Sequence, residues 1–492
     1  MNSPEHYPRV RIRGTLHCRS ALHIGDGDME LFAERCERSQ GQEGLYNSVC
    51  LDSTGRPYLP ASTLRGFLRE MAEYVGKNEL IIRLFGDQQQ SGALRCYDAY
   101  LLKIPTALDW PYWSAQRSTA VQHGVALNPI TGTVAAHKLF RHEYVPSGSE
   151  FSLELEADNL LVNDLSQVLG LLACWDGKAA TAIGKGISKG QGLLEWQLNE
   201  LQVLDHAALL NWLRGDESLE SCFRGEEKLP GPARYNSLSL KKLSFSLHPQ
   251  GPFLVNEPGY VQKSSKNSKL VQRQEEHLPD LEYSRLPDGR PLLPASSLRG
   301  VLRGRARRIL LTLAGQREIP AAYARERIDT LLLAHLFGET GQRSPLWISP
   351  AEGTAFKQHP QMFNAIDRFT GGVANDKLYQ VNAVTSKALD GVIHLEQERQ
   401  PEGDWWKGLL LLVARDALEG DLSLGWGKAR GYGAFTVTLT LEDGTVLDSW
   451  PALLAYLQHT QQRELAQSWI TALHDHLDAC LARTDCVEES HA

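Results

Sequence analysis

Alternating apolar and polar residues predict β-strands in both halves of the chain. The segment VRIRGTLHCRSALHI, residues 10–24, alternates and is rich in β-branched and apolar residues, as a pair of strands would be. FSLELEAD at 151–158 alternates again. Two glycine-dense segments open into the strand-like runs LLEWQL at 193–198 and AFTVTLTL at 434–441.

A helical period follows the first predicted strands. The apolar positions there recur at i, i+3, i+4, i+7 and i+11 and form one stripe: Leu64, Phe67, Leu68, Met71 and Val75. Pro60 and Ser62 are start signals for this helix. Residues 458–486 also have helical spacing and predict a C-terminal helix that packs on the second half. Strand, helix and further strands predict an α+β fold with ferredoxin-like layers, not a doubly wound parallel sheet.

The chain contains an internal repeat. LPASTLRGFLR at 59–69 returns as LPASSLRGVLR at 293–303. Further blocks match in the same order, with offsets between 234 and 252: LFG with LFG, LNPITGTVAAHKLF with IDRFTGGVANDKLY, GKGISKGQG with GWGKARGYG, and VLD before AALLNWL with VLD before PALLAYL. Such an ordered set indicates a tandem duplication.

The chain has 492 residues, which is more than a domain with a single hydrophobic core usually contains. This length agrees with two domains. We expect a first domain at 1–214, a polar Gly/Pro-containing linker at 215–237, a second domain at 238–458 and a C-terminal helical tail at 459–492.

Composition excludes some classes of protein. The formal net charge of −8 argues against a uniformly basic surface, although local patches could still bind nucleic acid. The chain has no apolar run of about 18 residues and no apolar core of a signal peptide near its N-terminus, so we expect a cytoplasmic protein without a membrane partner. The 8 cysteines form neither a C-x-x-C pair nor a zinc-like cluster with histidine, which favours reduced, packed thiols.

The repeated helix start has the composition of a phosphate-binding site. A helix N-terminus favours an anion, and arginines in the first turns could close over it. The candidate residues are Ser62, Arg65 and Arg69 in the first copy and Ser296, Arg299 and Arg303 in the second. The alternative is an ordinary capped helix with a solvated basic face.

Two further repeated segments are candidates for RNA contact. In the glycine-rich segments the backbone could approach a ligand closely, and Lys185, Lys189, Lys428 and Arg430 would supply charge. The alternative is a bulge or tight turn before a strand. A Walker motif is missing, so ATP is not expected. IDRFTGGVANDKLY, which contains Arg368, predicts a protruding β-hairpin.

Taken together, these blocks resemble the RAMP superfamily of CRISPR-Cas proteins, and within it the backbone subunits of type III effector complexes. The resemblance implies two tandem modified ferredoxin-like (RRM-like) domains that grip a CRISPR RNA, pair it with target RNA, and assemble with other RAMP and large subunits. By this resemblance, the candidate residues at the two helix N-termini would contact phosphates of the guide RNA. Segments 128–140 and 367–379 would correspond to the family's thumb hairpins, which insert between guide and target and flip out a nucleotide.

The resemblance also implies a site for target RNA cleavage. Several family members cut with an aspartate in the loop before the LPxSS helix, and counting back from the shared G-R-P places Asp280 there in copy two and Tyr46 in copy one. Copy two is therefore expected to cut, with Asp280 binding Mg²⁺, and copy one is not. Asp26 and Asp28 are fallback candidates in copy one. A lone loop aspartate is otherwise usually a turn residue.

Two rival functions stay open. One is a non-catalytic RNA-binding scaffold, and the other is a guide-processing endoribonuclease that uses His123 or His137. The polar loop VQKSSKNSKLVQRQEEH at 261–277 is expected to be mobile without RNA and ordered on binding, or simply a disordered insertion.

Overall fold

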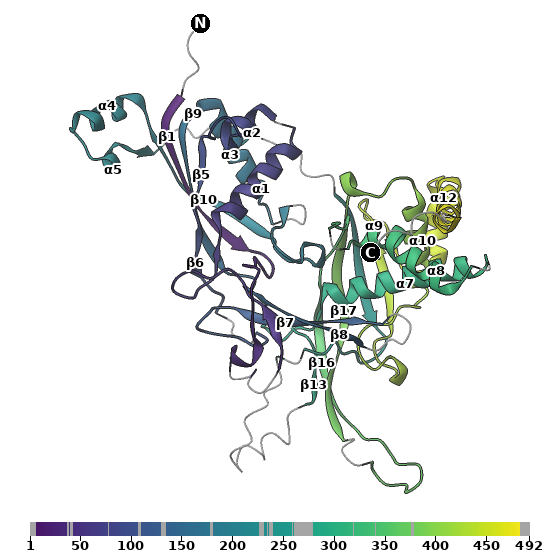
Figure 1. The fold of residues 1–492 in the computed structure, drawn as a ribbon. Helices are drawn as coiled ribbons and strands as arrows, with labels where there is room; N and C mark the ends of the chain where they lie inside the picture. Colours follow the sequence, from purple (N-terminus) through teal and green to yellow (C-terminus); the bar gives the residue numbers. More distant parts are fainter. Residues whose placement is uncertain are drawn as a thin grey trace, which may run out of the picture. The chain divides into compact units, whose positions relative to one another are not determined.

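The computed structural model is drawn in Figure 1. It describes residues 6–36, 39, 43–76, 78–106, 110–128, 134–177, 181–225, 231–233, 235, 240–257, 259, 279–317, 319–339, 341–374 and 378–482. The chain divides into two compact units. Unit 1 comprises Met1–Gln122, Phe140–Ile187 and Gln191–Leu238, and unit 2 comprises His123–Leu139, Ser188–Gly190 and Ser239–Ala492. The loop at 261–277 lies outside the described residues.

Unit 1 is built around one antiparallel sheet. The order of its central strands is β10-β1-β9-β6, with β11 beyond β10, β4 beyond β6, and β5 also paired with β9. The elements of the first half of the chain are β1 (His6–Cys18), β2 (Met29–Leu31), β3 (Leu45–Asn47), β4 (Tyr58–Leu59), α1 (Ala61–Tyr74), α2 (Asn78–Phe85), β5 (Leu94–Cys96), β6 (Ala99–Lys103), β7 (Ala120–Leu127), β8 (Val134–Tyr144), β9 (Glu150–Leu161), α3 (Val162–Leu172), β10 (Leu194–Leu204), α4 (His206–Arg214), α5 (Leu219–Cys222) and β11 (Arg224–Gly225). Of these, β7 from His123 onward and β8 up to Leu139 are assigned to unit 2.

Unit 2 repeats this sheet. The order of its central strands is β16-β17-β12-β18, with β14 and β19 at the edges and β13 and β15 also paired with β17. Its elements are β12 (Leu240–Pro249), β13 (Leu281–Glu282), β14 (Leu292–Leu293), α7 (Ala295–Gly315), α8 (Ala321–Arg327), the π-helix η6 (Ile328–Leu333), α9 (Ala334–Phe337), β15 (Leu346–Ile348), β16 (Ala351–Phe363), β17 (Tyr379–Glu396), α10 (Trp405–Leu418), β18 (Phe435–Thr440), β19 (Val446–Leu447), α11 (Trp450–His459) and α12 (Arg463–Ala482).

In both units the chain order is strand, helix, two strands, helix, strand, and the last strand pairs with the first. This is the ferredoxin-like arrangement, so the predicted α+β fold in two repeats is confirmed. The predicted apolar stripe is buried: Leu64, Phe67, Leu68 and Met71 all lie in the core of unit 1. Burial of this stripe against the sheet is what turns the periodic pattern into a stable helix.

The predicted C-terminal helix is present as α12, and it packs against α10. A Cβ atom at Gly408 would lie 2.4 Å from the carbonyl oxygen of Trp469, so the two helices are in close backbone contact. Leu473 and Leu477 of α12 are fully buried in the same core. None of the helices in the described part of the chain is both long and apolar enough to cross a membrane.

The stretch at 215–237, expected as a linker, contains ordered structure. Its α5 begins after Ser218, whose side chain accepts a hydrogen bond from the Ser221 N–H. Its β11 pairs with β10. Ala233 N–H donates to the Ser166 carbonyl on α3 at 2.9 Å. This stretch is therefore more than a connection, since it extends the sheet and covers part of α3.

The glycine-rich segments owe their glycines to close backbone packing. A Cβ atom at Gly192 would lie 1.9 Å from the Ile183 carbonyl oxygen, and one at Gly433 would lie 1.8 Å from that of Leu424. Both glycines have positive φ, 82° and 71°. The same constraint in both units means that these glycines are required by the fold, whatever else the loop does.

We expect Gly433→Ala to destabilise unit 2 by on the order of 3 kcal/mol, because the added methyl group collides with a backbone oxygen as well as straining φ. Gly431→Ala is the matched control. Its φ is also positive, 82°, but no atom lies within 4 Å of its Cβ position, so about 1 kcal/mol of strain is expected. Urea denaturation would measure both, and equal losses would contradict the packing argument.

Candidate nucleic-acid interface

The repeated helices begin two residues earlier than an N-cap at Ser62 or Ser296 requires. Pro60 and Pro294 occupy the N-cap positions, and neither makes a side-chain capping hydrogen bond. The expectation that serine caps these helices is therefore wrong, although Ser62 and Ser296 are both exposed in the first turn. In unit 1 the Ala61 N–H already donates to the Asp98 carboxylate at 2.7 Å. A carboxylate thus lies where a phosphate was expected.

Arg65 and Arg299 hold backbone carbonyls at equivalent places. Arg65 donates to the carbonyls of Phe85 and Leu94, the latter at 3.1 Å. Arg299 donates to the Leu346 carbonyl at 3.3 Å, and its guanidinium lies 5.8 Å from the Phe337 ring centroid. Burial, followed by the charge of Arg303, lowers the pKa of Arg299 to about 10, which still leaves it charged at neutral pH. Both arginines therefore fix the L-F-G turn to the helix, a structural role that repeats with the motif.

Most other arginines near these helices have acidic partners. Arg69 pairs with Glu73 on its own helix at 3.1 Å. In unit 2, Arg305 pairs with Asp416 at 2.5 Å, and Arg307 pairs with Asp329 at 2.7 Å. Arg303 is half-buried, and no ion pair is recorded for it among the described residues. Of the four arginines between Arg299 and Ile309, Arg305 and Arg307 are thus paired within the fold.

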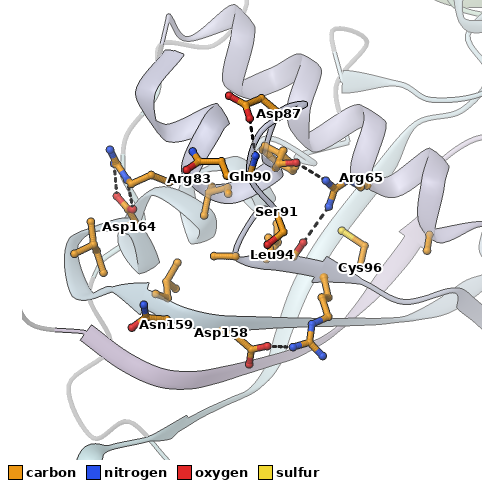
Figure 2. Close-up of a pocket in the computed structure, with 18 of the residues that line it drawn as sticks. Arg65, Arg83, Asp87, Gln90, Ser91, Leu94, Cys96, Asp158, Asn159 and Asp164 are labelled. Carbon is orange, nitrogen blue, oxygen red and sulfur yellow. Dashed lines mark hydrogen bonds and ion pairs between the residues drawn. The ribbon is translucent and has the colours of Figure 1, made fainter.

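A pocket of about 1070 Å³ lies beside the Arg65 turn in unit 1 (Figure 2). Ser62 and Arg65 line it, but its other arginines face carboxylates. Arg83 makes two hydrogen bonds of 2.8 Å to Asp164. Arg95 pairs with Asp158 across the lower wall. The pocket is therefore lined by paired positive and negative side chains and is not a positively charged phosphate-binding site.

The cations of the glycine-rich segments have different surroundings in the two units. In unit 1 Lys185 lies 3.5 Å from His142 Nδ1, and burial lowers its pKa. Lys189 ends a short 3₁₀ turn at 187–189. Burial also lowers the pKa of Lys428 in the equivalent turn of unit 2. Arg430 is exposed and donates to the Tyr379 hydroxyl.

The turn segment that connects β16 and β17 beyond the pair Phe363 and Tyr379, called the hairpin below, has an exposed apolar tip. Asp367 organises the turn, because its side chain accepts the N–H groups of Phe369 and Thr370 at 2.8 and 2.9 Å. Phe369 is fully exposed, and Ile366 is 64% exposed. Arg368 is exposed between them. Residues 375–377 and 129–133, parts of the two segments expected to be thumbs, lie outside the described residues.

Asp280 is anchored at the base of this hairpin. Its N–H donates to the Gln380 carbonyl, and its Oδ2 accepts the Gln380 N–H, both at 2.8 Å. The carboxylate is exposed and lies just before β13, which runs parallel to the start of β17. The chain thus places one carboxylate at a fixed point beside the strand that carries the hairpin.

The corresponding position in unit 1 is closed by a buried ion-pair network. Tyr46 is 1% exposed, and its hydroxyl donates to Glu30 at 2.6 Å. Arg117 bridges Glu30 and Glu143, and Glu143 also pairs with the buried Arg35 at 3.0 Å. Burial and the hydrogen bond to Glu30 raise the pKa of Tyr46, so it stays protonated. Sequence reasoning missed this network, whose members are scattered along the chain and show no motif.

Asp26 and Asp28 form a local turn. The Asp26 carboxylate accepts the Asp28 N–H and the Ser48 hydroxyl, both at 2.9 Å. Within the described ranges, no group of three or more His, Cys, Asp or Glu side chains is arranged to hold a metal ion. Asp280 by itself does not make a resident Mg²⁺ site, because that ion usually needs several oxygen ligands.

The comparisons with known proteins agree with this architecture. A family model described as the RAMP superfamily matches residues 15–195 and 250–436, one region in each repeat and well over half of the chain. The protein belongs to the RAMP superfamily, and this membership indicates a CRISPR-associated RNA-binding function. No match is found among curated proteins.

Glu143→Gln should destabilise unit 1 by about 3–5 kcal/mol, because the buried Arg35 would keep its charge without its carboxylate partner and Arg117 would keep only Glu30. Glu195→Gln is the control. Its partner Arg19, 2.5 Å away, is a surface residue, so less than about 1 kcal/mol should be lost. Chemical denaturation would measure the shift, and a loss no larger than that of the control would argue against a stabilising network.

Glu257, close to β13, predicts a dependence of stability on pH. It is 5% exposed, and burial raises the pKa of its carboxyl to about 8. The folded state therefore keeps the proton that the unfolded chain loses above about pH 4.5. From there to pH 8 this group lowers the free energy of unfolding by about 1.4 kcal/mol per pH unit.

Glu257→Gln should remove this contribution. The variant is expected to gain stability over the wild type as pH rises from 5 to 8, measured by denaturation midpoints at several pH values. A difference that stays constant with pH would show that Glu257 does not hold its proton.

Proposed function

We propose that this chain is a CRISPR RNA-binding backbone subunit of a type III effector complex, in which two fused units bind successive stretches of one guide. The tandem fold supports this, because a filament on RNA needs the same binding unit at each step. Its partners would be CRISPR RNA, target RNA, and the other RAMP and large subunits. We expect the complex to work in the cytoplasm.

The second unit would cleave the target RNA. The observation that carries this proposal is the exposed Asp280 carboxylate at the base of a hairpin with a fully exposed Phe369. The carboxylate accepts the Gln380 N–H, and the Asp280 N–H donates to the Gln380 carbonyl. An apolar tip can separate stacked bases, and a nucleotide displaced in this way can adopt geometries that a helix forbids. Unit 1 has Tyr46 at the matching position and would not cut.

The proposed reaction uses the RNA's own 2′-oxygen. This oxygen attacks the adjacent phosphorus and gives up its proton to a base, for which Asp280 is the candidate. The bond from phosphorus to the 5′-oxygen breaks, and the leaving oxygen takes a proton from water. The products are a 2′,3′-cyclic phosphate and a 5′-hydroxyl, and most of the acceleration would come from in-line positioning.

Mg²⁺ remains part of the proposal as an ion shared with the RNA. Asp280 offers one carboxylate, one oxygen of which already accepts a backbone N–H. Phosphate oxygens and water would have to complete any coordination shell. A requirement for divalent ions should therefore appear only in the presence of target RNA.

Two alternatives make different predictions. A non-catalytic scaffold would bind the same RNA without cutting it. A guide-processing endoribonuclease would cut repeat RNA as an isolated chain, using a histidine. His123 lies on β7 and is half-buried, and the side chain of His137 lies outside the described residues. Incubating the isolated chain with repeat RNA tests the second alternative.

Asp280→Asn should slow cleavage of a matched target by the assembled complex about 100-fold or more. The amide can still accept the Gln380 N–H but cannot take a proton. Asp443→Asn is the matched control, because Asp443 is another exposed turn aspartate of unit 2 and accepts the Thr445 N–H. Product mapping on gels measures both, and unchanged cutting by Asp280→Asn would favour the scaffold.

A further inference from the structure

Arg430 of the glycine-rich loop is exposed and contacts three aromatic rings. Its guanidinium carbon lies 5.1 Å from the ring centroid of Trp426, 5.5 Å from that of Phe363 and 5.7 Å from that of Tyr379. The rings also support one another, since Phe363 and Tyr379 stack at 5.5 Å and Trp426 meets Tyr432 edge-on at 5.4 Å. The side chain is thus held in one orientation, which lowers the entropy that a ligand must remove.

The way Arg430 is held leaves its charge available. By contrast, Arg305 and Arg307 of unit 2 are held by the carboxylates of Asp416 and Asp329. Arg430 has no carboxylate partner among the described residues, and its recorded contacts are rings and the Tyr379 hydroxyl. Cation–π contacts orient a guanidinium without cancelling its charge. Arg430 is also exposed, so an anion can reach it.

The cluster lies next to the anchor of Asp280. Tyr379 is the first residue of β17, and it accepts the Arg430 hydrogen bond through its hydroxyl. The next residue, Gln380, makes both hydrogen bonds to Asp280. A fixed cation and a fixed carboxylate are therefore attached to consecutive residues of one strand, at the base of the hairpin.

The first unit provides an internal comparison. The aligned glycine-rich blocks place Lys185 opposite Trp426, Lys189 opposite Arg430, and Gln191 opposite Tyr432. The rings contributed by this loop are thus missing from the same copy that has Tyr46 in place of Asp280. The ring-held arginine and the exposed aspartate occur together in one repeat, although backbone binding to a guide would be needed in both.

We propose that Arg430, oriented by Trp426 and Tyr379, binds the phosphodiester backbone of the RNA strand that is cut beside Asp280. This inference rests on the proposed function and deepens it, because it separates the cleaving repeat from the repeat that only binds. The ligand is a phosphodiester of single-stranded RNA, recognised by charge and not by base.

Cleavage by the assembled complex is the first test, at saturating target RNA in single turnover. Arg430→Ala should slow cleavage about 10-fold or more, since the strand loses a charged, positioned contact. Arg430→Lys should recover only part of the rate, because lysine keeps the charge but not the planar group. Arg399→Ala is the matched control. Arg399 is an exposed arginine of unit 2 paired with Glu396 at 2.8 Å, and its loss should leave the rate unchanged.

Trp426→Leu tests whether the rings act through Arg430. It should slow cleavage less than Arg430→Ala, and the double variant should be no slower than Arg430→Ala alone. Additive losses would mean that Trp426 acts independently and would overturn the orienting role. Equal thermal midpoints for the single variants would exclude a change in folding as the cause.

Affinity of the full chain for a single-stranded RNA separates this inference from the proposed function. Arg430→Ala should reduce the slope of log affinity against log salt by about 0.7, the value for one phosphate contact. If Asp280→Asn cuts normally while the Arg430 slope falls, the cleavage assignment fails and the phosphate site stands. If Arg430→Ala matches Arg399→Ala in both rate and slope, the inference is overturned.

Discussion

Close backbone approach in the glycine-rich loops is the constraint on which the rest of each unit depends. A side chain at Gly184 would meet the His23 carbonyl at 2.4 Å, and one at Gly425 would meet the Leu254 carbonyl at 2.2 Å. The loop is thereby fixed to the segment that follows the first strand. In unit 2 this contact holds Arg430 near the hairpin base, so a steric requirement of the fold determines where the charge lies.

The two units share their framework and differ in the side chains placed on it. Arg65 and Arg299 perform the same structural task at the L-F-G turn. At the position before the repeated helix, one unit buries Tyr46 in an ion-pair network and the other exposes Asp280. After a duplication both copies must keep the residues on which folding depends. Their surface residues can diverge, because most surface substitutions change stability little.

Buried and half-buried ion pairs decide which cations remain for a ligand. Arg305 and Arg307, which the sequence places in one basic run, pair with acidic residues farther along the chain, Asp416 and Asp329. Among the residues that the structure describes, Arg430 contacts aromatic rings instead of a carboxylate, so its positive charge is not neutralised by an ion pair. The number of basic residues near a motif is therefore a poor guide to an anion site, and their partners are the better one.

The sequence by itself determined the repeat, the α+β class, the apolar stripe of α1 and the C-terminal helix, because these depend on local period and on matching blocks. It also marked the glycine-rich loops and the hairpin. The proline N-caps of the repeated helices, the roles of Arg65 and Arg299, and the buried network around Tyr46 were decided only by tertiary structure. The same holds for the ring cluster, since Phe363, Tyr379 and Trp426 come from β16, β17 and the glycine-rich loop, and only the folded sheet brings them together.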